Sequence, residues 1–120
     1  LHLSLRRQRQ MCIRDSFGMS GTDIETAVRA EVPITTVVLN NGGMATYPGG
    51  FPTARKQYGV SEMYGNYAQI AEGMGAVGLV VESPTELVDA LKSAQRLNKE
   101  GKTVLVDVHS NMESRRSRWN

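Results

Sequence analysis

Residues 17–43 read FGMSGTDIETAVRAEVPITTVVLNNGG, and this stretch carries the clearest structural pattern in the chain. Thr22, followed three residues later by Glu25, has the form of a capping box, so we expect a helix over 23–31 that ends before the next proline. The run 34–39 is almost entirely apolar and β-branched, which is typical of a strand buried on both faces of a parallel sheet. It ends in two asparagines and two glycines, residues that form tight turns.

The alternation of helix and strand continues after residue 65. Asn66 with Gln69 is a second candidate helix start, and Ser83, Pro84 and Glu86 form a third. Helices followed by short apolar strands predict an α/β fold with a partial, doubly wound parallel sheet. The expected strands are 34–39, 77–81 and 103–109, and the expected helices are 23–31, 67–74 and 84–99.

A long connection, 42–65, separates the two parts of this pattern. Loops of this length inside a compact α/β domain are usually functional or contain a short helix. We expect one or two helical turns near 53–58. Tyr47, Phe51, Arg55 and Lys56 lie in this connection, where contact with a substrate and simple exposure to solvent are both open.

The first sixteen residues, LHLSLRRQRQMCIRDS, follow neither a helical nor a strand period. Their second half resembles the translation of a sequencing-library adapter, so we expect 1–16 to be adventitious and outside the fold. The chain then divides into this leader, a truncated domain over 17–112 and a basic tail over 113–120.

Composition excludes several classes of function. The net charge of +2 comes from the two ends, because residues 1–16 hold four arginines against one aspartate and residues 113–120 hold three against one glutamate. Basic residues therefore do not gather on the domain, and we expect no nucleic-acid binding. One cysteine excludes an internal disulfide framework, and no apolar run is long enough for a membrane span. We expect a cytoplasmic protein without a membrane partner.

Two polar turns are the candidate site. Parallel sheets bind ligands beyond the carboxyl ends of their strands, which is where the turn Asn40–Gly43 lies. Residues 17–22 precede the start of the 23–31 helix, which favours anions such as phosphate, and we expect this helix start to face the Asn41 turn. The residues alone leave two interpretations open, a cradle for a diphosphate with its metal and an ordinary structural turn. Asp107 and His109 on the last strand are expected to be hydrogen-bonded edge groups.

Taken together, FGMSG, IETAVR and LNNGG resemble the second half of the cofactor motif of thiamine diphosphate-dependent enzymes. The nearest branch is the acetolactate synthase-like one, with oxalyl-CoA decarboxylase, 2-hydroxyacyl-CoA lyase and benzaldehyde lyase. The resemblance implies the thiamine diphosphate-binding fold over roughly 17–112. It also implies a parent enzyme that uses thiamine diphosphate and Mg²⁺ and that forms a homodimer or homotetramer.

The resemblance assigns roles to six residues. Asn41 matches the side-chain ligand of Mg²⁺, and Gly43 matches the position whose carbonyl binds the same ion. The cofactor-binding positions are Ser16, Phe17, Asn41, Gly43, Met44 and Ala45. This chain departs from the family at one position. Where the family has its metal-binding aspartate, this chain has Arg14, and the nearest aspartate, Asp15, lies one residue further along the sequence.

The resemblance implies a parent enzyme that acts on a small-molecule substrate, a 2-keto acid or a 2-hydroxyacyl-CoA or oxalyl-CoA compound, by decarboxylation or by cleavage or formation of a C–C bond. The glutamate that activates the cofactor comes from a domain outside these residues, so the matching residues include no catalytic group. Two alternatives remain: another nucleotide- or flavin-binding α/β domain, and a non-catalytic interaction fragment.

Overall fold

The computed structural model describes residues 9–43, 52–59 and 65–111, and for residues 9–16 it describes the backbone alone. Helices and strands alternate through these ranges, as the sequence predicts. The elements are β1 (Arg9–Ile13), α1 (Arg14–Ser20), α2 (Asp23–Arg29), β2 (Thr35–Asn40), α3 (Pro52–Tyr58), α4 (Tyr67–Gly73), β3 (Val77–Val81), α5 (Leu87–Lys99) and β4 (Val104–His109).

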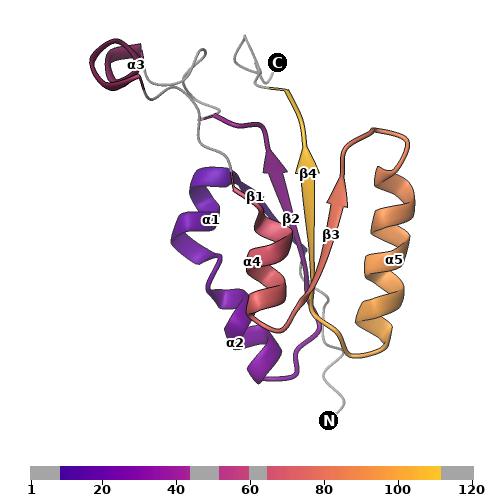
Figure 1. Ribbon diagram of the computed structural model, residues 1–120. Coiled ribbons are helices and arrows are strands. Elements are labelled where there is room, and N and C mark those ends of the chain that lie inside the picture. The colour runs from indigo at the N-terminus through magenta and orange to yellow at the C-terminus, as the bar shows by residue number, and fades with distance from the viewer. Residues whose placement is uncertain (1–8, 44–51, 60–64, 112–120) are drawn as a thin grey trace, which may run out of the picture.

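The four strands form one parallel sheet in the order β1-β2-β4-β3. Helices α1, α2 and α4 lie on one face of the sheet and α5 lies on the other (Figure 1). This arrangement confirms the predicted doubly wound parallel α/β fold. The three predicted strands are correct to within one residue at each end, and the short helix expected near 53–58 is α3.

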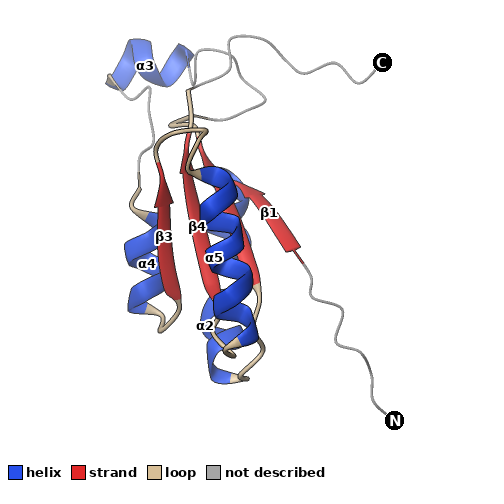
Figure 2. Ribbon diagram, turned by 90° about the vertical axis from the view of Figure 1, so that its right-hand side faces the viewer, coloured by secondary structure: helices blue, strands red, loops and turns tan. Residues whose placement is uncertain are grey.

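The prediction for the leader is wrong in one respect. Residues 9–13 do not lie outside the fold, because they form β1, an edge strand that pairs with β2 from Arg9 opposite Thr35 to Ile13 opposite Leu39 (Figure 2). Residues 14–20 continue into α1. Strand pairing uses main-chain groups, so a segment without a side-chain period can still complete the open edge of β2. Residues 1–8 lie outside the described residues, and the adventitious origin of the leader stays a prediction.

The sheet separates two apolar clusters. One lies under α1, α2 and α4 and is built on Val38 and Leu105, both fully buried. The other lies under α5, where Ala94 and Leu97 pack against β3 and β4. Leu87, Ala90, Ala94 and Leu97 follow helical spacing, so they place one face of α5 on the sheet.

Helices α2, α4 and α5 end in the same way. At each end a residue in the left-handed conformation follows the helix, and two N–H groups bond back to carbonyls of its last turn, as in a Schellman motif. Gly75 and Gly101 have φ of 86° and 83°, as expected for glycine stops. After α2 this position is Glu31, with φ of 55°, which explains why that helix ends at Arg29 and not at residue 31.

The structure confirms only some of the predicted helix starts. Asn66 caps α4, since its Oδ1 accepts the N–H of Gln69 at 2.9 Å. Glu86 accepts the N–H of Ser83 at 3.1 Å, but the regular helix begins three residues later than predicted, at Leu87. Thr22 makes no side-chain cap, because α1 runs directly into a helical turn and leaves Thr22 itself helical. The capping box at Thr22 is therefore wrong.

Candidate functional site

The turn after β2 is held by its own side chain. The Oδ1 atom of Asn41 accepts the N–H of Gly43 at 3.1 Å, and Gly42 between them has φ of 68°. Asn41 is half-buried, whereas both glycines are buried. A side chain that bonds to the main chain two residues ahead fixes the turn before any ligand arrives.

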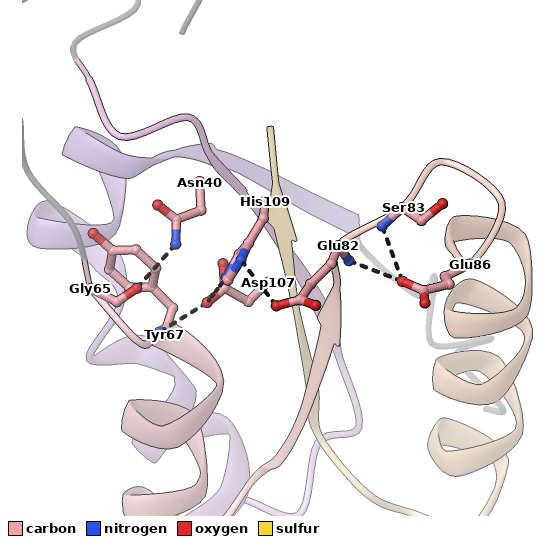
Figure 3. A network of polar contacts seen from close by, with 8 residues as sticks. All are labelled: Asn40, Gly65, Tyr67, Glu82, Ser83, Glu86, Asp107 and His109. Carbon is pink, nitrogen blue, oxygen red and sulfur yellow. Dashed lines mark hydrogen bonds and ion pairs between the residues drawn. The ribbon is translucent and has the colours of Figure 1, made fainter. Parts of the chain in front are cut away.

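The neighbouring Asn40 faces a different segment. It is 7% exposed, and its Nδ2 donates to the carbonyl of Gly65 at 3.0 Å, just before α4 begins (Figure 3). Its Oδ1 is buried and has no hydrogen-bond partner among the described residues. Asn40 therefore joins the carboxyl end of β2 to the start of α4.

The position of the nearest helix differs from the prediction. We expected the amino end of the 23–31 helix to face the Asn41 turn. Instead, α1 begins directly after Ile13, which pairs with Leu39, so the start of α1 is level with the end of β2. Helix α2 lies below α1, away from the carboxyl ends of the strands (Figure 1). The prediction missed α1 because its residues were assigned to the leader and to a turn.

Phe17, one of the six predicted cofactor-binding residues, lies in the core. It is 9% exposed, and its ring meets that of Tyr67 edge to face with centroids 4.8 Å apart. Phe17 therefore fixes α1 against α4. The backbone of Ser16 lies in the same helix, and the structure describes nothing of its side chain.

Several predicted residues cannot be placed. Met44 and Ala45, and also Tyr47 and Phe51, lie outside the described residues. Arg55 and Lys56 are exposed on α3, which lies apart from the sheet in Figure 1.

A polar network lies beside the turn, on the face of the sheet that α4 covers (Figure 3). Asp107 is 1% exposed, and its Oδ2 accepts the N–H of Tyr67, the first residue of α4, at 3.1 Å. His109 lies between two carboxyl groups, with Nε2 3.6 Å from Asp107 Oδ2 and Nδ1 3.9 Å from Glu82 Oε1. Asp107 is hydrogen-bonded, as predicted, but it is a buried residue of the central strand β4 and not an edge group.

The described residues do not make a complete Mg²⁺ site. A magnesium ion in such a site is usually held by one or two carboxylates together with ligand phosphates. Among the described residues no three His, Cys, Asp or Glu side chains gather as a metal site, and the position of the expected carboxylate is taken by Arg14. The amide oxygen of Asn41 and the carbonyl of Gly43 remain as oxygen donors of the right kind.

The sequence contained a signal for Asn40 that our prediction did not use. Asn40 ends a strand whose face toward α4 is otherwise formed by Thr36 and Val38, all three buried. A polar side chain at such a position needs a partner, because burying an unpaired amide is costly. The identity of the partner, Gly65, comes from 25 residues away and could not be read from the pattern.

Comparison with known proteins gives the family. Residues 15–108 match the family model described as "Thiamine pyrophosphate enzyme, C-terminal TPP binding domain". The chain is 40% identical over 96 residues to an acetolactate synthase of Bacillus subtilis and 35% identical over 97 residues to a sulfoacetaldehyde acetyltransferase of Alcaligenes xylosoxydans xylosoxydans. These alignments cover 77% and 78% of this chain, but 16% of each relative.

A third relative is a 2-hydroxyacyl-CoA lyase of Oryza sativa, 31% identical over 108 residues, which cover 83% of this chain and 19% of the relative. The chain thus spans less than a fifth of the length of these relatives.

The fold agrees with this family. A thiamine diphosphate-dependent 4-hydroxybenzoylformate decarboxylase of Rhodococcus jostii superimposes with a TM-score of 0.74. The match covers 92% of this chain and 21% of that one, at 21% identity. Within the described ranges no helix has the length and apolar character needed to cross a membrane. The parallel sheet, the Asn-Asn-Gly-Gly turn and the match over residues 15–108 together show that this chain belongs to the thiamine pyrophosphate enzymes and corresponds to their C-terminal TPP-binding domain.

Proposed function

We propose that this chain is the diphosphate-anchoring part of a thiamine diphosphate-dependent enzyme. The observation that carries the proposal is the turn Asn41–Gly43, which is held by its own hydrogen bond at the carboxyl end of β2, level with the start of α1. Buried glycines beside an amide oxygen leave main-chain groups free to approach a ligand closely. When bound, thiamine diphosphate supplies an electron sink for carbanion chemistry, while the protein binds and orients it.

The parent enzyme acts on a 2-keto acid or on a 2-hydroxyacyl-CoA or oxalyl-CoA compound, by decarboxylation or by cleavage or formation of a C–C bond. This choice is supported by the names of the relatives, which include an acetolactate synthase, a 2-hydroxyacyl-CoA lyase and an acetyltransferase. We further propose that the parent is a cytoplasmic homodimer or homotetramer that binds Mg²⁺ with its cofactor. The family match removes the alternative of an unrelated nucleotide- or flavin-binding domain.

The isolated chain is expected to bind the cofactor weakly or not at all. Arg14 takes the place where the family resemblance puts the first metal carboxylate, so a metal ligand is lost and a positive charge is added near the ion. The protein would then offer the metal only the neutral oxygens of Asn41 and Gly43 beside the diphosphate, without the carboxylate that Mg²⁺ usually has.

Calorimetry with thiamine diphosphate and Mg²⁺ tests the proposal on three proteins. The first is the chain itself. The second carries Ile13→Gly, Arg14→Asp and Asp15→Gly, which restores the family's turn. The third adds Asn41→Ala to the restored turn. We expect saturable binding by the second protein alone, and a loss of at least about tenfold in the third, because one metal ligand and the bond that shapes the turn are both removed.

Each other result has a defined meaning. Tight binding by the unmodified chain would show that Arg14 does not block the metal and that our interpretation of the leader is wrong. Binding by the restored protein that Asn41→Ala leaves unchanged would place the cofactor elsewhere. A restored protein that folds, oligomerises and binds no thiamine diphosphate would favour the alternative of a non-catalytic interaction fragment, and circular dichroism supplies the control for folding.

A further inference from the structure

A second crevice opens at the carboxyl edge of the sheet, away from the Asn41 turn. The chain leaves β2 toward α4 on one face and leaves β3 toward α5 on the opposite face, while β4 lies between these two strands (Figure 1). Open α/β sheets bind ligands at such switch points, where connections diverge and leave the strand ends uncovered. A cavity of about 570 Å³ lies there, with Asn40, Val80, Glu82, His109 and Ser110 in its wall.

Strand register places the polar residues of this cavity in one row. Asn40 pairs with His109, and Val81 pairs with Val108, so Glu82, the residue directly after β3, lies level with His109. Side chains alternate along a strand, and His109 shares its face with Asp107 and with Leu105, which packs in the cluster under α4. The row therefore stands on the side of the sheet that α4 covers, just beyond the start of that helix.

Acidic groups flank the imidazole on both sides. Nε2 of His109 lies 3.6 Å from Oδ2 of Asp107, whose other oxygen is buried without a hydrogen-bond partner among the described residues. Nδ1 lies 3.9 Å from Oε1 of Glu82, and the Glu82 side chain is 76% exposed. Figure 3 shows His109 between the two carboxyl groups. The imidazole is thus supported from the core by Asp107, and its other nitrogen lies beside the exposed carboxyl group of Glu82.

The charged groups among the described wall residues favour a positively charged ligand. No lysine or arginine is among the described residues that line the cavity, whereas Glu82 is acidic and His109, Asn66 and Ser110 offer further hydrogen-bonding atoms. An anion placed there would face the carboxylate of Glu82, with no lysine or arginine among the described wall residues to compensate it.

The volume of the cavity fits a small organic molecule better than a bare ion. Pockets for small organic molecules are about 300–1,000 Å³ in volume, and this cavity falls within that range. The described residues also hold no group of three His, Cys, Asp or Glu side chains suited to a metal. Val80 is 47% exposed although it is aliphatic, and it gives the wall an apolar patch.

We propose that this cavity binds a small organic ammonium ion, with its nitrogen against Glu82 and His109 and its alkyl part on Val80. The site lies on the opposite side of Asn40 from β1 and is independent of the proposed cofactor site, so each can fail without the other.

The test uses n-butylammonium as the probe and NMR of the isotopically labelled full chain as the readout. We expect saturable shifts of the Val80 methyl groups and the His109 ring, with a dissociation constant on the order of 1–10 mM for so small a ligand. Glu82→Gln should weaken binding about threefold to fivefold, since this acid is exposed and its charge is partly screened. Glu72→Gln, an exposed acid of α4 outside the cavity wall, is the matched control and should leave the affinity unchanged.

Three ligands of other charge complete the experiment. Neutral 1-butanol and anionic butyrate should not produce these shifts at about 100 mM, roughly tenfold above the upper end of the expected range of dissociation constants. Butyrate that binds as well as n-butylammonium would overturn the proposal, as would the absence of any saturable shift with n-butylammonium. Shifts of His109 with Zn²⁺ but not with n-butylammonium would make the site a metal site and would also overturn it.

Discussion

The side chain of Asn40 donates from Nδ2 to the carbonyl of Gly65 at 3.0 Å, while the next residue, Asn41, accepts the N–H of Gly43 at 3.1 Å. The connection between β2 and α4 is therefore fixed at both of its ends by adjacent residues of one strand terminus. One asparagine acts as a donor and the other as an acceptor. Because of this difference, we expect the fold to need the side-chain N–H group of Asn40 but the side-chain oxygen of Asn41.

Asn40→Asp should destabilise the chain by at least about 2 kcal/mol, because the substitution replaces a buried donor with an acidic group that faces the Gly65 carbonyl. The free energy of unfolding in urea measures the effect. Asn66→Asp is the matched control: Asn66 is exposed and uses its Oδ1 to cap α4, a role that aspartate keeps. Equal losses in the two variants would contradict the assigned role of Asn40.

Asp107→Ala should cost about 1–3 kcal/mol, since it removes the buried carboxylate that accepts the N–H of Tyr67. We expect α4 to lose protection in amide hydrogen exchange more than α5 does, because Asp107 bonds to the first residue of α4. Asp107→Asn keeps an acceptor oxygen and should lose less. Asp89→Ala, an exposed acid on α5, should change stability by less than about 0.5 kcal/mol. A uniform loss of protection across all helices would argue against a local anchor.

Two glycines give a paired test of how closely α4 packs on β3. A Cβ atom added at Gly78 would lie 2.5 Å from the main-chain oxygen of Ala68, so Gly78→Ala forces the helix and the strand apart. We expect a loss of about 1–3 kcal/mol, as for other overpacked cores. Gly73 lies at the end of the same helix with open space around it, and Gly73→Ala should be neutral or stabilise by up to about 1 kcal/mol. Thermal unfolding of the two variants decides between these outcomes.

Removal of residues 1–13 tests the unexpected strand. Without β1 the main-chain groups along one edge of β2 lose their partners, so we expect lower stability and concentration-dependent self-association. Analytical ultracentrifugation and urea unfolding measure the two effects. A shortened chain that stays monomeric and equally stable would show that β1 contributes no binding energy to the sheet.

Local patterns in the sequence were enough to locate most elements. The run 34–39 before Asn40 forms a strand because it is β-branched and almost entirely apolar, and Gly75 and Gly101 end helices because their positive φ values favour glycine. Asn66 caps α4 for an equally local reason, since its partner, Gln69, is three residues away. The family resemblance could likewise be read from contiguous motifs.

Thr22 shows where local patterns fail. Its spacing to Glu25 is that of a capping box, but α1 precedes it without a break and removes the free helix end that the box would cap. Helix α1 begins directly after β1, whose last residue, Ile13, pairs with Leu39 near the carboxyl end of β2.

The sequence by itself determined the alternation of helices and strands, the helix ends set by glycine and the turn at Asn41 and Gly43, because each depends on residues a few positions apart. Tertiary structure alone decided that β1 joins β2, that Asn40 bonds to Gly65, and that Glu82 and Asp107 meet at His109. These contacts join segments far apart in the chain, and they follow from the order of the strands in the sheet. A side-chain period reports which residues share a face, but it carries no information on which strand lies next to another.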